Sequence, residues 1–147
     1  ADEFDPALTA GKFTVYLGSH GDRGAAAANV ILPTAAYGEK PGTWVNLEGR
    51  VQRGARAVPP PGDAREDWSV MRALSDVLGV TLPYDDYASL RARIAAEWRH
   101  LAVEGLAATP WTALEIAAAT PSGPVAYAVD NFYLTNAIAR ASDTMAD

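Results

Sequence analysis

Two short apolar runs on either side of an alanine-rich segment constrain the fold more than any other feature of this chain. The runs cover residues 13–17 and 29–32 and consist mainly of residues that favour β-strands. Between them, Asp22 has the chemistry needed to cap a short helix at 25–28. Strand, helix and strand in this order predict two parallel strands with the helix on one face of the sheet.

The next segment, residues 34–62, is rich in glycine and proline and is predicted to be irregular. Within it, only residues 43–46 are expected to be extended, and the prolines before Gly62 predict a stiff spacer. Two interpretations of the arginines in this segment are open: contacts with phosphate, or a solvated or partner-facing stripe, which we favour. These arginines are Arg50, Arg53 and Arg56.

The rest of the chain is predicted to be mainly helical. Asp63 and Glu66 are spaced as a capping box and Gly79 is placed as a C-terminal stop, which predicts a helix between them. Its apolar stripe is expected in the core and consists of Trp68, Met71, Leu74 and Leu78. Further helices are expected at 85–105, 110–119 and 134–145, with a strand at 125–129.

The expected fold class is therefore α/β: a partial parallel-sheet segment followed by a mainly helical C-terminal region. Residues 1–62 would be the end of an α/β domain with a long loop. Residues 63–147 would be a helical region that packs on it, so that both form one structural unit. The chain opens at Ala1 without methionine, and we expect it to be the tail of a longer polypeptide.

Composition excludes several classes of function. The net charge of −6 argues against a general nucleic-acid binder, which needs a basic surface to displace phosphate counterions. The absence of cysteine excludes disulfides, zinc thiolate sites and iron–sulfur ligation within these residues. Two histidines cannot form a histidine-rich metal site, and no apolar run reaches the ~20 residues that a membrane span needs.

The loop after the first run carries two candidate chemistries. His20 and Asp22 could act as a general base and its orienting carboxylate, or simply belong to a polar loop, which we favour because no nucleophile accompanies them. Gly18, Gly21 and Gly24 have a GxxGxxG spacing that is similar to a phosphate-binding loop at a helix N-terminus. Glycine spacing alone is a weak signal for a bound phosphate.

A second candidate group lies in the glycine-rich segment. Glu39, Glu48 and Arg50 could clamp a polar ligand, or an arginine–carboxylate pair could order the long loop. We favour the ordering role. His100 is expected to lie at a helix end, where a cation is favourable. The residues alone therefore predict no catalytic constellation.

Four linked motifs give a much more specific signal. They are NVILP at 29–33, EKPGTWVN at 39–46, EGRVQ at 48–52 and PPGDAREDW at 60–68. In this order and spacing they resemble the late part of the molybdopterin oxidoreductase fold. The flanking stretches YLGSHGD at 16–22 and DNFYLTNAIARASDTMA at 130–146 resemble the large iron–sulfur subunit of respiratory complex I. That family is the G-type, or 75 kDa-type, subunit of NADH-quinone oxidoreductase.

The resemblance implies a role in electron transport. The parent complex would be an oxidoreductase and translocase that passes electrons from NADH through iron–sulfur clusters to quinone. The 4Fe–4S and 2Fe–2S clusters would be held upstream, so this segment would carry no catalytic, cofactor-binding or metal-binding residue. The signature loop would be structural, and its residues are Glu39, Thr43, Asn46, Glu48, Arg50 and Gln52.

The resemblance also implies partners and a location. The partners would be the upstream part of the same subunit and other subunits of the peripheral arm, with no nucleic acid and no membrane span. The complex would lie on the cytoplasmic face of the bacterial inner membrane or on the mitochondrial matrix side.

Two other functions are considered. The first is the tail of a catalytic molybdenum or tungsten oxidoreductase, such as a formate dehydrogenase relative, which a downstream barrel or a bound pterin would favour. The second is an independent small-ligand module, in which nucleotide binding at loop 18–24 would be lost on Gly21→Val. The mainly helical sequence after Trp68 argues against the barrel of the catalytic enzymes.

Overall fold

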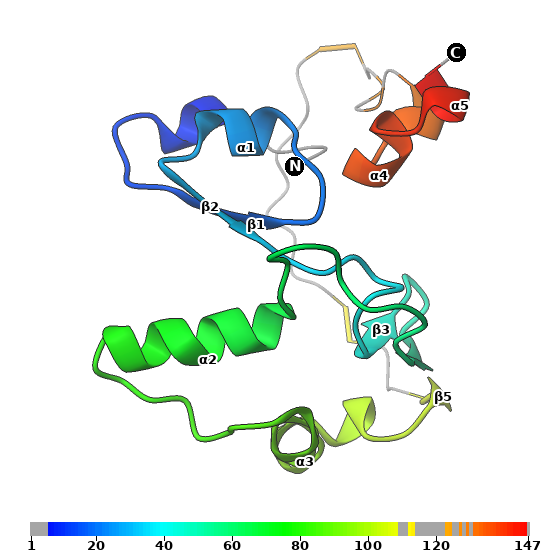
Figure 1. The fold of residues 1–147 in the computed structure, drawn as a ribbon. Coiled ribbons are helices and arrows are strands. Elements are labelled where there is room, and N and C mark those ends of the chain that lie inside the picture. The colour runs from blue at the N-terminus through cyan, green and yellow to red at the C-terminus, as the bar shows by residue number, and fades with distance from the viewer. Residues whose placement is uncertain are drawn as a thin grey trace.

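The structure is a computed structural model that describes residues 6–108, 112–113, 123–124, 127, 129 and 131–146. Helices and short strands are mixed along this part of the chain, in agreement with the α/β class (Figure 1). The elements, in chain order, are η1 (Pro6–Thr9), β1 (Val15–Gly18), α1 (Arg23–Ala27), β2 (Val30–Pro33), β3 (Gly42–Val45), β4 (Arg50–Gly54), α2 (Asp67–Val77), α3 (Tyr87–Glu97), η2 (Arg99–Leu101), β5 (Gly105–Leu106), η3 (Phe132–Leu134), α4 (Ala137–Arg140) and α5 (Asp143–Ala146).

The predicted strand–helix–strand unit is confirmed. β1 and β2 pair in parallel, with Val15 opposite Val30 and Gly18 opposite Pro33. The connecting helix α1 begins after Asp22, whose carboxylate accepts hydrogen bonds from the backbone N–H groups of Gly24 and Ala25. This N-cap fixes where the chain turns back across the sheet.

The chain returns to this sheet after a long excursion. Thr34, directly after β2, forms a parallel bridge with Arg65. Arg65 N–H donates to the Pro33 carbonyl at 3.2 Å, and Ala35 N–H donates to the Arg65 carbonyl at 2.9 Å. The small side chains here, Thr34, Ala35 and Ala64, are buried. The chain therefore leaves the sheet after Ala35 and returns beside it at Arg65, and residues 36–62 form the connection between these neighbouring positions.

Most of a second, antiparallel sheet lies within that excursion. Its strand order is β3-β4-β5, and Val51 at its centre is 3% exposed. The expected extended piece at 43–46 is confirmed as β3. β4 was not anticipated, because its arginine-rich sequence shows no apolar alternation and its pairing partners lie on both sides along the chain.

The predicted capping box at the start of α2 is wrong. Glu66 occupies the N-cap position but makes no side-chain capping bond. Its carboxylate instead accepts from the Trp68 indole N–H at 2.5 Å and lies 3.8 Å from Arg56. Asp63 is not at the N-cap, because Arg65 bridges to Thr34 and the helix begins only after Glu66.

The predicted end of α2 is confirmed, but its apolar stripe is not buried. Gly79 has a φ of +76° and its N–H binds the Asp76 carbonyl, while Val80 N–H binds the Ser75 carbonyl. This pair of bonds is the Schellman motif that glycine favours. Met71 is 46% exposed and Leu78 is 70% exposed, so the interpretation of this stripe as core is wrong for them.

The predicted helix at 85–105 is too long. α3 ends at Glu97, and Trp98 leaves helical geometry at φ −126° and ψ 77°. A short 3-10 turn and β5 follow, so Gly105 belongs to a strand. His100 lies within the 3-10 turn η2.

The expected C-terminal helix is present as two pieces, α4 and α5. The predicted helix at 110–119 and strand at 125–129 lie largely outside the described residues.

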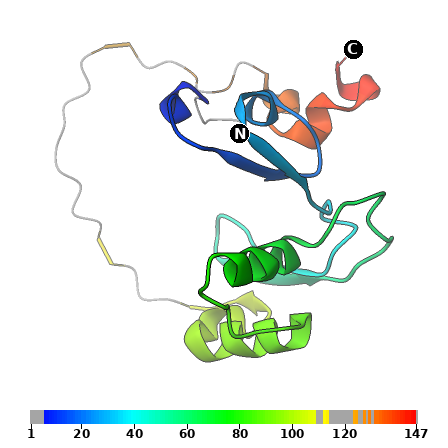
Figure 2. The same cartoon turned by 60° about the vertical axis from the view of Figure 1, so that its left-hand side comes forward.

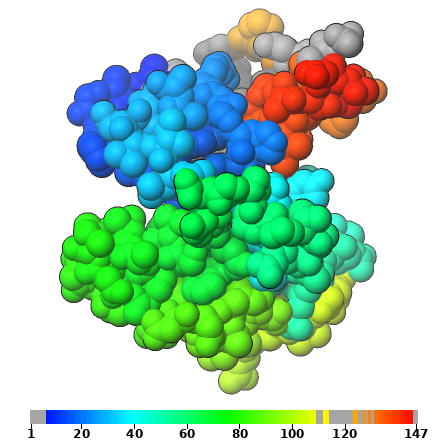
Figure 3. All heavy atoms as spheres, viewed as in Figure 1, coloured from blue at the N-terminus to red at the C-terminus, as the bar shows by residue number. Residues whose placement is uncertain are grey.

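Segments from the two ends of the chain lie side by side. The C-terminal pieces α4 and α5 lie next to α1 and the β1–β2 pair, whereas α2, α3 and the second sheet form the other half (Figures 1 and 2). The space-filling view shows the same division, with the two halves in contact (Figure 3). Among the helices of the described ranges, none has the length and apolar character needed to cross a membrane.

Candidate functional site

The signature loop is the β3–β4 hairpin, and Asn46 and Gly49 build its turn. Gly49 N–H binds the Asn46 carbonyl at 3.0 Å, and Asn46 N–H binds the Arg50 carbonyl at 3.2 Å. The Asn46 side-chain oxygen accepts from the backbone N–H groups of Glu48 and Arg50. Gly49 has a φ of +83°, a conformation that costs other residues energy. The NLEGR stretch therefore specifies a three-residue hairpin loop that closes with a bulge.

Glu48 and Arg50 form an ion pair on this turn. Arg50 Nε donates to Glu48 Oε1 at 3.0 Å, and Asn46 Nδ2 donates to the same oxygen at 3.3 Å. The Arg50 guanidinium, followed by the Asn46 amide, holds the pKa of Glu48 below its ordinary value. The two charged groups are thus directed at each other across the loop.

The other signature residues, like Glu48 and Arg50, contact or pair with residues of the same chain. Glu39 accepts from the backbone N–H of Ala36 at 2.9 Å, which closes a turn after β2. Thr43 pairs with Arg53, and Gln52 pairs with Trp44, in the hairpin register. The structure brings Asn46, Glu48 and Arg50 together at the turn, and Glu39 makes its contact at a different turn.

Glycines at the base of the hairpin make room for Trp44. A Cβ atom on Gly54 would lie 2.9 Å from the Trp44 indole nitrogen, and one on Gly42 would lie 3.0 Å from the ring. The indole therefore lies across both glycines on one face of the hairpin. Packing against this indole is therefore a structural reason for glycine at positions 42 and 54.

The arginines that follow the turn contact groups within the chain. Arg53 donates to the Ala102 carbonyl at 2.5 Å and lies 3.4 Å from Glu104. Arg56 lies 3.8 Å from Glu66. These contacts connect the hairpin to β5 and to the start of α2, so the arginines do not present one common stripe to a phosphate.

The loop after β1 uses its polar groups on its own backbone. Tyr16 donates its hydroxyl hydrogen to the His20 carbonyl at 2.7 Å, and the His20 ring nitrogen Nδ1 lies 3.0 Å from the Ser19 hydroxyl. Asp22 caps α1 and lies 3.5 Å from Arg140 of α4. The described contacts therefore do not pair His20 with Asp22 as a base and its orienting carboxylate.

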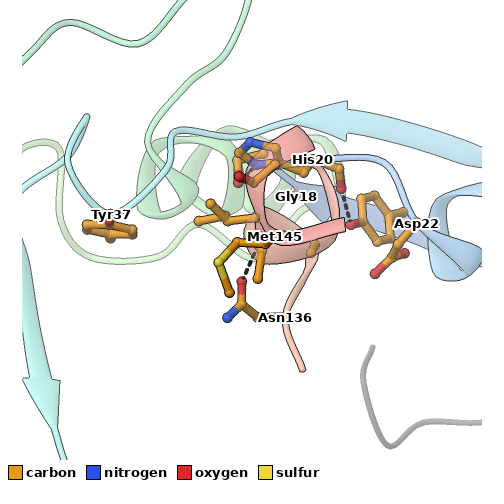
Figure 4. A pocket seen from close by; sticks show the side chains of 12 residues that line it. Gly18, His20, Asp22, Tyr37, Asn136 and Met145 are labelled. Carbon is orange, nitrogen blue, oxygen red and sulfur yellow. Dashed lines mark hydrogen bonds between the residues drawn. The ribbon is translucent and has the colours of Figure 1, made fainter. Parts of the chain in front are cut away.

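A groove with a volume of about 720 Å³ separates this loop from the C-terminal helices. One side is formed by residues of the loop, including His20 and Asp22, and the other by Asn136 and Met145 (Figure 4). Tyr37 lies at a further edge. Sequence reasoning missed this groove because it joins positions more than 100 residues apart. Among the residues that line the groove, Asn136 carried a local signal, because asparagine favours the start of a helix and its side chain caps α4 through the Ala139 N–H.

Across the described ranges, no three metal-ligating side chains gather at one point.

The sequence matches two protein families. Residues 2–77 match molybdopterin oxidoreductase, which includes β1, β2 and the signature hairpin. Residues 103–147 match the C-terminal part of the G-type subunit of NADH-ubiquinone oxidoreductase.

Individual relatives agree with the second match. The mitochondrial NADH-ubiquinone oxidoreductase 78 kDa subunit of Neurospora crassa is 44% identical over 99% of this chain. The mitochondrial NADH dehydrogenase iron-sulfur protein 1 of Solanum tuberosum is 49% identical over 91% of this chain. The 75 kDa subunit of Reclinomonas americana is 44% identical over 99%. The chain spans 21%, 19% and 22% of the length of these relatives, respectively.

The first family is named after a cofactor that does not fit the loop after β1. The N–H groups of Gly24 and Ala25, which would be available to a phosphate, are bound to the Asp22 carboxylate. The Tyr16 ring lies against both ends of this loop, because a Cβ atom would lie 2.5 Å from the ring at Gly18 and 3.3 Å from it at Gly24. A cofactor phosphate would meet a carboxylate and an aromatic ring here, so the residues present do not fit the group.

The family assignment rests on which elements of the chain are matched and on how much of the chain the matches cover. The molybdopterin oxidoreductase match covers just over half of the chain and includes the parallel pair, the hairpin and all of α2. The relatives extend the similarity to nearly all of the remaining residues. The chain therefore belongs to the molybdopterin oxidoreductase family and is homologous to part of the 75/78 kDa subunit of NADH-ubiquinone oxidoreductase.

Proposed function

We propose that the chain is a structural, non-catalytic C-terminal segment of the large iron–sulfur subunit of NADH:quinone oxidoreductase, respiratory complex I. The observation that carries this proposal is the 44–49% identity to subunits of that name over most of the chain. The match of residues 103–147 to the C-terminal part of the G-type subunit supports the same position in the polypeptide.

In this proposal the segment lies beside the path of the electrons. The parent complex would pass electrons from NADH through iron–sulfur clusters, of the 4Fe–4S and 2Fe–2S types, to quinone and couple this transfer to proton translocation. Clusters of these types are held mainly by cysteine thiolates, and the chain has none. The cluster ligands would therefore come from the upstream part of the subunit.

The parallel pair supports a structural role that needs the rest of the subunit. Parallel sheets are normally covered on both faces and have more than two strands. Here Ile31 of β2 is 55% exposed and Val15 of β1 is 38% exposed. Upstream strands and helices of the same subunit would continue this sheet, with residues 1–62 ending the α/β domain and residues 63–147 packing on it.

The signature loop would organise the fold rather than bind a ligand. Asn46, Gly49 and the Glu48–Arg50 pair are engaged in the turn itself, which supports this role. Other subunits of the peripheral arm would contact the segment. Its location would be the matrix side of the mitochondrial inner membrane or the cytoplasmic face of the bacterial one.

The proposal predicts the metal content of the native assembly. A tag at the C-terminus of this chain allows the assembly to be purified, and its metals to be measured by plasma mass spectrometry. We expect abundant iron, no stoichiometric molybdenum or tungsten, and NADH:quinone activity.

Stoichiometric molybdenum or tungsten would contradict the proposal and support a catalytic relative of the formate dehydrogenase type. A matched purification from the untagged strain controls for metal carried by contaminating proteins.

A further inference from the structure

Within the described residues, an ion pair joins the C-terminal helices to the loop after β1. Arg140 Nη2 of α4 lies 3.5 Å from Asp22 Oδ2, across a separation of 118 residues. The Asp22 side chain is 7% exposed and the Arg140 side chain is 34% exposed. Partial burial of this kind reduces screening by solvent, so the pair is worth more than one on the open surface.

Both partners are also held in place by their own elements. The other oxygen of Asp22, Oδ1, accepts from the N–H groups of Gly24 and Ala25 at the start of α1. Arg140 donates through Nη1 to the Leu134 carbonyl at 3.0 Å. Neither side chain has to be ordered anew to form the ion pair, which lowers its entropic cost.

The ion pair lies beside the groove between the two segments. Tyr16 and His20 line it from the β1 side, and Ile138 and Met145 line it from the C-terminal side. The groove lies at the carboxyl end of β1, because Gly18 at the end of that strand lines it, and the carboxyl ends of strands are where open α/β sheets usually bind their ligands. Figure 4 shows the C-terminal helix in front of this loop.

We propose that the Asp22–Arg140 ion pair is a clasp that fastens residues 131–146 beside the carboxyl end of β1. The clasped segment supplies the second wall of the groove at this end of the sheet and so limits the access of a ligand to it. This inference goes beyond the proposed function, because it does not depend on which complex contains the chain.

Two substitutions separate the clasp from the helix cap. Asp22→Asn keeps an oxygen that caps α1, because asparagine caps as well as aspartate, but it removes the charge that faces Arg140. Arg140→Gln removes the opposite charge and leaves the cap untouched. We expect each variant to speed hydrogen exchange in residues 131–146 by about fivefold, the effect of a partly buried ion pair.

Exchange is measured by mass spectrometry on the full-length polypeptide in its purified assembly. The double variant should exchange no faster than Asp22→Asn alone, because Arg140→Gln has no ion pair with residue 22 left to break in that background. Peptides that cover residues 21–28 should keep their protection in both single variants. Arg93→Gln is the matched control, since it breaks an exposed ion pair with Glu97 far from the groove along the chain.

Three results would overturn the clasp. The first is unchanged hydrogen exchange of residues 131–146 in Arg140→Gln, and the second is that the two effects multiply in the double variant. The third is that exchange in Asp22→Asn rises as much at residues 21–28 as at residues 131–146. The first would mean that the pair fastens nothing. The second would mean that the two residues act independently. The third would mean that Asp22 acts only through the cap.

Discussion

At the turn of the β3–β4 hairpin, Gly49 has a backbone conformation that other residues adopt only at a cost. A Cβ atom at this position meets no atom within 4 Å, so the φ of +83° alone makes glycine necessary. We expect Gly49→Ala to destabilise the hairpin by about 1 kcal/mol and Gly49→Asn by less, because asparagine tolerates the left-handed region. Hydrogen exchange of the β3 and β4 amides in the full-length polypeptide measures this.

Gly38→Ala is the matched control, because its surroundings are equally open and its φ is not positive. Equal effects of Gly38→Ala and Gly49→Ala would show that backbone strain is not the reason for glycine at 49.

Single residues differed in how well the sequence predicted them. Asp22 was predicted to cap α1 and does so, because its partners lie two and three residues ahead. Glu66 was predicted to act in a capping box, but its carboxylate binds the Trp68 indole N–H. The ion pair between Asp22 and Arg140 could not be predicted, since no local pattern connects positions 118 residues apart.

At the scale of the element, α3 has a reciprocal capping box that depends on charge. Ser89 N–H donates to Asp86 Oδ1 at 2.6 Å, and Asp86 N–H donates to the Ser89 hydroxyl at 3.2 Å. The bonds that Ser89 donates to the Asp86 carboxylate, first from its backbone N–H and then from its side chain, lower the pKa of Asp86 from its ordinary 3.8. The cap therefore stabilises α3 fully above that ordinary value, and its contribution is lost as the pH falls through the lowered pKa.

We expect acid to weaken the protection of the first turn of α3 in the native chain but not in Asp86→Asn. Asparagine caps equally well and does not titrate in this range. The measurement is hydrogen exchange of residues 89–91, corrected for the intrinsic rate, at several values of pH. Asp63→Asn should behave like the native chain, because Asp63 is exposed and distant in sequence. The same pH dependence in Asp86→Asn would refute the role of this charge.

Elements were predictable where their signals were local. The strand–helix–strand unit follows from two apolar runs and a capping residue. α3 ends earlier than its apolar stripe predicted, because Gly105 and Leu106 pair with β4 and Arg53 holds the Ala102 carbonyl. Tertiary pairing overrides the helical pattern there. β4 was missed for the related reason that its partners, not its own residues, make it a strand.

At the scale of the whole molecule, most of the apolar surface has no cover within the described residues. The buried apolar side chains there are Ala25, Ala35, Val51 and Ala64, and none is large. Leu47, Val77 and Val80 are among many apolar residues that are mostly exposed. Small buried side chains contribute little hydrophobic free energy against the entropy lost on folding.

The isolated 147-residue chain should therefore be marginally stable or aggregate. We expect scanning calorimetry to show no sharp unfolding transition and a hydrophobic dye to bind strongly at low temperature. A sharp, cooperative and reversible transition of the purified chain would contradict this and show that it folds without neighbours.

The bridge between Thr34 and Arg65 gives residues 36–62 the character of an insertion between neighbouring positions, although β4 within it also pairs with β5. Both of its ends are anchored at adjacent positions of one sheet, so changes in its length do not move the strands that it connects. The entropic cost of a longer loop grows slowly, by about 0.6 kcal/mol for each doubling. Evolution can therefore exchange or extend this hairpin, and with it the surface offered to a neighbour, while the sheet beneath stays the same.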